Sequence, residues 1–199
     1  MGKKARVFAV ILILSMIGSV SVCAFAERPA EGIGKWLQEV GVFVGYLRGS
    51  LKGQKNMEGI PTGLRFGFDL KPFTKKFGFD PKGMLELIYE PFINTITQPR
   101  TNMEMGLGIL FRYSYPLTSK LYPYIEVGTG PYYTTLKTHE QSTQFNFDDQ
   151  GGGGLTYFFR NDTAVNIGYR FRHVSNAGIK SPNGGIQCHE YLIGLSHYF

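Results

Sequence analysis

The sequence predicts an all-β fold, an eight-stranded antiparallel transmembrane β-barrel preceded by a cleaved signal peptide. An export signal opens the chain, no later run of residues is apolar enough for a helical membrane span, and most of the remainder alternates between apolar and polar side chains. The 26 glycines and 15% aromatic residues suit tight strand packing and an aromatic surface. Export without a helical span leaves a soluble β-sandwich or a membrane barrel as the main architectures.

The first 26 residues have the organisation of a secretory signal peptide. Three basic residues among the first six precede an apolar run from Val7 to Val20, and Ala24-Phe25-Ala26 provides a small-x-small cleavage site. The apolar run is short and no stop-transfer charge cluster follows it, which argues against a transmembrane helix. We therefore expect cleavage after Ala26 and one folded domain over residues 27–199, a length typical of a single domain.

Charge and cysteine content exclude several classes of protein. Loss of the signal removes three basic residues and no acidic one, so the formal net charge falls from +6 to +3. This charge is too small, and too evenly spread, to predict a nucleic-acid partner. Only Cys188 remains in the mature chain, so stability must come from packing and hydrogen bonds rather than from an internal disulfide.

Alternation with a period of two is the main secondary-structure signal. Because successive strand residues point to opposite faces, such a pattern gives one apolar and one polar surface. The clearest example is Ile60–Lys71, where the even-numbered positions are mostly apolar and the odd-numbered ones are glycine, proline or charged. The eight expected strands are Ile60–Lys71, Met103–Ser114, Val165–Arg172 and Tyr191–Phe199, with weaker patterns over Val40–Arg48, Met84–Pro91, Leu121–Lys137 and Phe145–Arg160.

The polar face is expected to line the lumen of a small barrel. It combines charged residues with glycine, as a narrow lumen requires, whereas a sandwich would turn its apolar faces inward. Six basic and six acidic residues lie on this face and suit paired ions. They are Arg65, Lys71, Arg112, Arg160, Arg170 and Arg172, and Asp69, Glu86, Glu90, Glu104, Glu126 and Glu190. Eight strands fill their own lumen, so a transport pore is not expected.

Loop lengths orient the expected barrel. With both chain ends in the periplasm, the even-numbered turns are periplasmic, and these turns are usually short. The periplasmic turns would be Lys71–Lys82, Tyr115–Lys120 and Arg160–Thr163, and the outer loops would be Gly49–Met57, Asn94–Asn102, Thr138–Thr143 and Asn176–Ile186. The first periplasmic turn is longer than this rule predicts. Gly151–Gly154 is expected to interrupt its strand and bend the barrel wall.

Residues 172–187 contain the side chains that could carry chemistry. His173 and Ser175 continue the lipid-facing set of their strand, where polar groups are costly unless they lie at the interface or have a function. They lie about 6.6 Å apart along the strand, a span that an imidazole can bridge to act as general base for a serine. If the last two strands pair His173 with Gln187, the two Cβ atoms lie about 5 Å apart. An interfacial histidine and a turn-forming serine remain the alternative interpretation.

The same segment resembles the active-site signature of lipid A 3-O-deacylases of the PagL type, a family of eight-stranded outer-membrane barrels. That signature is His-x-Ser-Asn-x-Gly, then Pro-Asn, then an acid twelve residues after the serine. The resemblance implies that Ser175 is the nucleophile and His173 the base. It also implies an oxyanion hole formed by the Gly178 backbone N–H and the Asn183 side chain, with Asn176 nearby. It implies no metal and no other cofactor.

One position departs from the family pattern. The acid of the signature falls on Gln187, whose amide can orient the imidazole but cannot stabilise imidazolium by charge. An acid-to-amide exchange in a serine protease lowers the rate by about 10⁴-fold. Glu190 is close in sequence, but its even number directs it into the lumen. We therefore expect an active but slowed hydrolase.

The resemblance implies a carboxylic ester hydrolase that removes an acyl chain from lipid A in the outer leaflet of the outer membrane. An ester at that interface is accessible to a serine on the barrel exterior. A non-catalytic structural or adhesion barrel is the main alternative, and Gln187 is the residue that favours it. A soluble β-sandwich that binds a ligand is a third possibility.

Overall fold

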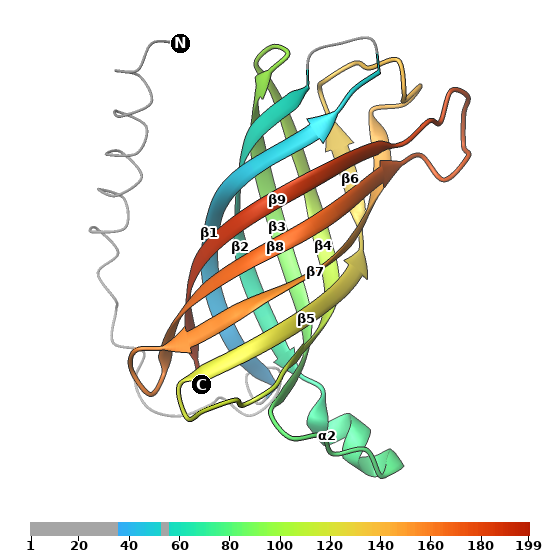
Figure 1. Ribbon diagram of the computed structural model, residues 1–199. Helices are drawn as coiled ribbons and strands as arrows, with labels where there is room; N and C mark the ends of the chain where they lie inside the picture. Colours follow the sequence, from blue (N-terminus) through green and yellow to red (C-terminus); the bar gives the residue numbers. More distant parts are fainter. Residues whose placement is uncertain (1–35, 53–55) are drawn as a thin grey trace, which may run out of the picture. The chain divides into compact units, whose positions relative to one another are not determined.

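The computed structural model describes residues 36–52 and 56–199, so the expected signal peptide lies outside the described residues. Within these described residues, nine strands and two short helical segments follow one another (Figure 1). They are β1 (Leu37–Ser50), β2 (Met57–Asp69), α2 (Lys71–Thr74), η2 (Lys75–Phe77), β3 (Met84–Gln98), β4 (Asn102–Ser114), β5 (Leu121–Thr129), β6 (Pro131–Thr134), β7 (Phe145–Phe158), β8 (Thr163–Ser175) and β9 (Ile186–Tyr198).

These strands form a closed antiparallel barrel with eight strand positions. Apart from β5 and β6, each strand pairs with its neighbours in sequence, and β9 pairs with β1 to close the ring. Both β5 and β6 lie between β4 and β7, so they are two halves of one barrel strand. Gly130 separates the halves at a point where a Cβ atom would lie 1.8 Å from the carbonyl oxygen of Leu107. The predicted fold class and strand number are therefore confirmed.

Two local expectations are wrong. β3 continues to Gln98, because its last residues still pair with β2 and β4, so the second outer loop is shorter than Asn94–Asn102. Gly151–Gly154 does not interrupt β7, since all four residues keep an unbroken register with β5 and β8. There a glycine is required by close approach: a Cβ on Gly154 would lie 2.6 Å from the Tyr124 hydroxyl oxygen.

The polarity of the barrel is inverted relative to a soluble protein. Charged side chains such as Arg112 and Glu90 are buried in the lumen, whereas Val42, Ile125 and Ile167 are exposed on the exterior. An apolar exterior around a polar interior is the arrangement of a barrel that spans a bilayer. Separately, neither helical segment among the described residues is long and apolar enough to cross a membrane.

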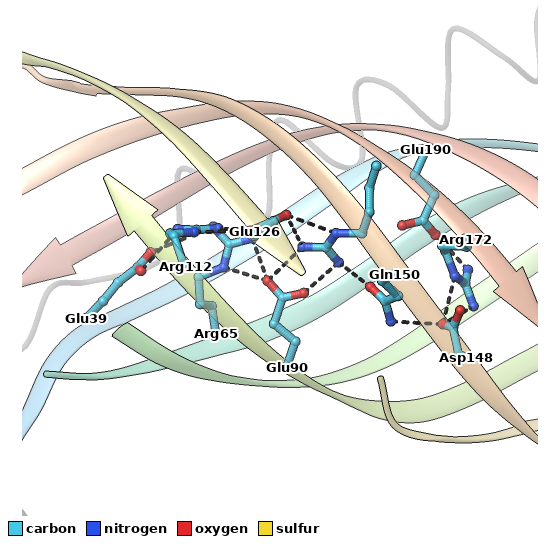
Figure 2. Close-up of polar contacts among 10 residues, drawn as sticks. Glu39, Arg65, Glu90, Arg112, Glu126, Asp148, Gln150, Arg172 and Glu190 are labelled. Carbon is cyan, nitrogen blue, oxygen red and sulfur yellow. Dashed lines mark hydrogen bonds and ion pairs between the residues drawn. The ribbon is translucent and has the colours of Figure 1, made fainter. Parts of the chain in front are cut away.

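A chain of ion pairs fills the lumen (Figure 2). Arg112 binds Glu126 at 2.7 Å and Glu39 at 3.4 Å, and the Arg112 guanidinium lies 4.2 Å from the centre of the Tyr124 ring. Arg170 then bridges Glu126 and Glu90, each at 2.7 Å. Arg172 binds Asp148 and Glu190, which confirms the prediction that the Glu190 side chain points into the lumen.

The expected balance of six bases and six acids in the lumen is wrong. Lys71 and Arg160 lie in turns beyond the strand ends, where alternation in the sequence no longer sets the direction of a side chain. Glu39 and Asp148 are buried in the lumen instead. The buried charged residues of the described strands are four arginines and seven acids, namely Arg65, Arg112, Arg170 and Arg172, and Glu39, Glu86, Glu90, Glu104, Glu126, Asp148 and Glu190.

Replacing Arg112 with alanine should destabilise the barrel, because the buried carboxylates of Glu39 and Glu126 would each lose one of their arginine partners. Breaking a buried ion pair typically costs about 3–5 kcal/mol in the free energy of unfolding. Urea titration of the refolded protein in detergent, followed by heat-modifiable gel migration, measures this change. Arg160→Ala, which removes the same side chain from an exposed turn, is the matched control and should leave the midpoint unchanged. Equal midpoints for the two variants would contradict a stabilising role of the lumen network.

The two ends of the barrel differ in their connections. The terminal end, where β1 begins and β9 ends, carries the turns 70–83, 115–120 and 159–162. The loop end carries the connections 51–56, 99–101, 135–144 and 176–185. The lumen is closed by apolar side chains near both ends, with Phe158 and Tyr198 at the terminal end and Leu47, Val174 and Ile186 at the loop end.

Candidate active site

His173 and Ser175 lie on the exterior face at the loop end of β8. Their neighbours Arg172 and Val174 are buried in the lumen, whereas Phe171 is exposed on the exterior. His173 and Ser175 continue this alternation and are half-buried. The two side chains therefore lie where the apolar exterior of the barrel meets the connection that follows β8.

Two polar residues flank His173 on the neighbouring strands. The register pairs His173 with Gln187 on β9, as the hairpin argument expected, and with Asp149 on β7. Asp149 is exposed and its Oδ1 accepts a 2.7 Å hydrogen bond from the Thr129 hydroxyl. Sequence reasoning missed Asp149, because its odd number placed it on the exterior but nothing in the sequence set the register between β7 and β8.

The imidazole of His173 rests against Gly185, which lies in the connection between β8 and β9. A Cβ atom on Gly185 would lie 2.4 Å from Cε1 of His173 and 3.1 Å from Nε2. Within the described part of the chain, no hydrogen bond joins His173 to Ser175. Hydrogen bonds of catalytic groups are often long in structures without substrate and form only in the complex. Gly185 thus leaves the space in which the imidazole ring lies.

Replacing Gly185 with alanine should lower ester hydrolysis by about 10²-fold, because a methyl group would displace the imidazole from Ser175. Gly185 also has a φ of 71°, a conformation that alanine adopts at a cost. Gly184→Ala is the matched control, since the nearest atom to its Cβ would be Glu140 O, at an ordinary contact distance of 3.7 Å. Deacylation rates of the two folded variants, measured side by side, provide the comparison. A Gly185→Ala variant as active as Gly184→Ala would show that the ring tolerates the displacement.

Asn176 holds the outer turn that follows the serine. Its side chain is fully buried, donates to Lys180 O at 2.7 Å and accepts a 3.0 Å bond from the Gly178 N–H. Ala177 and Gly178 both have positive φ, at 53° and 78°, and Ile179 N donates to Asn176 O, so the chain reverses in a tight turn. The N–H group expected in the oxyanion hole is therefore engaged by Asn176 in this state.

Asn183 approaches the serine from the far side of the same turn. Its Oδ1 accepts a 2.9 Å hydrogen bond from the backbone N–H of Asn176, which directly follows Ser175. This bond uses the oxygen of the amide, so the Nδ2 group remains as a donor. The structure thus brings Asn183 beside Ser175, whereas Asn176 acts within the turn itself.

The outer connection 135–144 supports this turn from the neighbouring hairpin. Gln141 forms a bridge with Asn183, and Gln141 Nε2 donates to Val174 O at 3.3 Å. Ser142 accepts from Asn176 Nδ2 and donates to Lys180 O at 2.9 Å. Glu140 O accepts a 2.8 Å bond from Gly184 N. The connection 176–185, which follows Ser175, is therefore held by hydrogen bonds at several points.

Aromatic side chains continue the exterior surface from His173 toward the middle of the barrel. Phe171 and Tyr169 follow it on β8, and His189 and Tyr191 follow Gln187 on β9. His189 stacks against Tyr169 and contacts Phe171 edge-on, and its Nδ1 lies 2.7 Å from the Tyr169 hydroxyl oxygen. Over residues 36–52 and 56–199, no group of three or more histidine, cysteine, aspartate or glutamate side chains is placed to hold a metal ion.

A closed eight-stranded barrel with an apolar exterior, ionic lumen and polar residues at its outer rim belongs to the class of small membrane β-barrels. The profile of the family described as lipid A 3-O-deacylase (PagL) matches residues 61–196, about two thirds of the chain. The chain belongs to that family. A comparison with curated protein sequences gave no match.

Solved structures show the same fold. The crystal structure of the outer membrane enzyme PagL has a TM-score of 0.59 and 21% identity, covering 78% of this chain and 97% of that one. Neisserial surface protein A (NspA) has a TM-score of 0.62 and 12% identity, covering 81% and 96%. The attachment invasion locus protein Ail of Yersinia pestis has a TM-score of 0.50 and 12% identity, covering 81% and 99%.

Proposed function

We propose that this protein hydrolyses the ester at the 3-O position of lipid A in the outer leaflet of the outer membrane. Family membership supports the substrate, because the family is described by that reaction. One observation carries the proposal: His173 and Ser175 lie two positions apart on the exterior face of β8, at the loop end. A nucleophile on the apolar exterior of a membrane barrel is accessible to a lipid of the surrounding bilayer, as an enzyme acting on a membrane lipid requires.

In the proposed mechanism, His173 accepts the proton of the Ser175 hydroxyl as Oγ attacks the carbonyl carbon of the acyl ester. The tetrahedral intermediate collapses when the bond to the sugar oxygen breaks, and His173 returns the proton to that oxygen. Water then attacks the acyl-serine and again gives a proton to His173, which passes it to Ser175 Oγ. The products are a free fatty acid and lipid A with one new hydroxyl group.

Asn183 and Gly178 are the proposed donors to the developing oxyanion. The Nδ2 group of Asn183 is available as a donor, because the hydrogen bond from Asn176 N uses only the Oδ1 atom of the same amide. The Gly178 N–H donates to Asn176 Oδ1 and must exchange this partner to reach the oxyanion. Donors aimed at the charge that develops in the transition state stabilise it more than they stabilise the neutral ester.

The proposed placement has the loop end outside the cell and the terminal end in the periplasm. It follows from expected export through a signal peptide over residues 1–26, which leaves both chain ends in the periplasm, and from the connections 135–144 and 176–185 at the loop end, which are longer than the turns 115–120 and 159–162. The glucosamine ester of lipid A then lies at the level of Ser175. The acyl chain stays in the bilayer, against the aromatic surface around Phe171 and Tyr191.

A non-catalytic surface barrel remains the second candidate, because Gln187 replaces the acid of the family signature. The likeness to surface proteins such as NspA fits either candidate, since it concerns the fold alone.

Mass spectrometry of lipid A distinguishes the two candidates. Lipopolysaccharide is incubated with the refolded barrel in detergent, and lipid A is then released and weighed. An esterase yields a new species that lacks one acyl chain, together with the matching free fatty acid. An unchanged lipid A mass profile at high enzyme concentration and long incubation would reject the esterase in favour of the surface barrel.

A further inference from the structure

The connection between β2 and β3 is an unusual turn for the terminal end of the barrel. Residues 70–83 contain α2 and η2, whereas the two other turns at this end are short and contain no helix. Figure 1 shows this segment projecting sideways from the end that carries the C-terminus. Neither α2 nor η2 buries a single residue, so the helical segment does not serve to pack the barrel.

Three phenylalanine rings of this turn have no partner surface among residues 36–52 and 56–199. Phe73, Phe77 and Phe79 are 55%, 74% and 57% exposed. Phe73 and Phe77 contact each other, with ring centroids 5.1 Å apart, and so present one apolar surface. Large apolar side chains clustered on a protruding segment mark a site that contacts another apolar phase.

The same turn carries an excess of positive charge. Four lysines lie within residues 71–82, at Lys71, Lys75, Lys76 and Lys82, and Asp80 is the only acid. Asp80 pairs with Lys71 and Lys75, at 3.3 Å in each case. Among the described residues, no carboxylate pairs with Lys76 or Lys82. A short helix that combines exposed aromatic rings with lysines is typical of a segment lying at the surface of an anionic bilayer.

The base of the turn lies against the membrane-facing wall of the barrel. The hydroxyl of Tyr113, an exterior residue of β4, donates to Lys82 O at 2.8 Å. At the other end of the turn, Asp69 N donates to Trp36 O at 2.8 Å, and the Trp36 side chain is exposed. Tryptophan and tyrosine gather where a barrel meets the lipid headgroups. The turn therefore starts and ends at the level of an interface.

We propose that residues 71–82 form a lipid anchor that inserts Phe73, Phe77 and Phe79 into the bilayer leaflet at the terminal end and binds anionic phospholipid headgroups through its lysines. The occupant is a phospholipid surface rather than lipid A, because lipid A is the proposed substrate at the opposite end of the barrel. The anchor is independent of catalysis. It fixes the depth of the barrel in the membrane from the side opposite Ser175.

A single tryptophan placed in the turn tests the anchor. Trp36 is the only tryptophan of the chain, so Trp36→Phe combined with Phe77→Trp gives one reporter. The folded variant is reconstituted into phosphatidylcholine vesicles with or without phosphatidylglycerol. We expect emission at shorter wavelength than in the urea-unfolded protein, protection from acrylamide and quenching by brominated acyl chains. Both the wavelength shift and the protection should be larger with phosphatidylglycerol.

Charge variants in the same reporter background separate the lysines from the rings. Lys76→Gln should reduce the difference between the two kinds of vesicle. Lys120→Gln makes the same change in another turn of the same end and should leave the difference intact. Emission and acrylamide quenching equal to those of the unfolded protein in both vesicles would overturn the anchor. Equal protection with and without phosphatidylglycerol would overturn the proposed binding of anionic headgroups by the lysines. Protection that requires added peptidoglycan would assign the turn to the cell wall and also overturn the proposal.

Discussion

Replacing Ser175 with alanine is expected to abolish deacylation of lipid A while the barrel still folds. The substitution removes the proposed nucleophile, and loss of the nucleophile in a serine hydrolase lowers the turnover rate by at least about 10⁴-fold. Ser175 is half-buried on the exterior, and no hydrogen bond of the described residues depends on its hydroxyl. The fold should therefore tolerate the change, which separates chemistry from stability.

The assay compares the release of fatty acid from purified lipopolysaccharide by the wild type and the variant at equal concentrations of folded barrel. Heat-modifiable gel migration reports the folded fraction. Ser181→Ala, at an exposed serine in the same outer connection, is the matched control and should keep the wild-type rate. Residual hydrolysis by Ser175→Ala close to the wild-type rate would move the nucleophile to another residue.

Replacing Gln187 with glutamate is expected to raise the rate of deacylation. The register places Gln187 opposite His173, where a carboxylate can stabilise the imidazolium that forms when the base takes the serine proton. The gain has an upper limit of about 10⁴-fold, the cost of the reverse exchange in a serine protease. Rates measured at saturating lipopolysaccharide report this step, because the substitution does not change the ester-binding surface.

Asp149 determines how large that gain will be. It pairs with His173 in the register of β7, on the side opposite Gln187, so position 173 has an acidic residue on one neighbouring strand and an amide on the other. Asp149→Asn, tested alone and together with Gln187→Glu, measures the coupling between the two positions. The gain from Gln187→Glu should be larger when Asp149 is neutral. No gain in either background would contradict a catalytic role for position 187.

Much of the fold could be predicted because the strands alternate strongly. In β2, β4, β8 and β9 the period of two identified both the strand and the direction of each side chain, since lipid imposes one polarity on the exterior. The prediction was less accurate at strand ends. Lys71 and Arg160 continue the alternation but lie in turns, and β3 extends seven residues beyond the predicted end at Pro91.

In the candidate site, the sequence predicted only the residues that belong to a single hairpin. His173, Ser175 and Gln187 belong to one hairpin, so parity and the pairing of two consecutive strands sufficed to bring them together. Asp149 lies on β7, and its position opposite His173 depends on a register that residues 159–162 and the whole length of both strands fix together. The bond that engages the Gly178 N–H depends in the same way on the fold of the outer turn.

The sequence by itself determined that the chain forms an inside-out barrel with a polar pair on its outer surface, because two-residue periodicity is a local property. Tertiary structure alone decided which charges meet in the lumen and which carboxylate faces His173. It also decided that the long turn at the terminal end presents phenylalanines and lysines together. These features depend on the register between strands and on the course of the connections, which the side chains of many strands set jointly when the barrel closes.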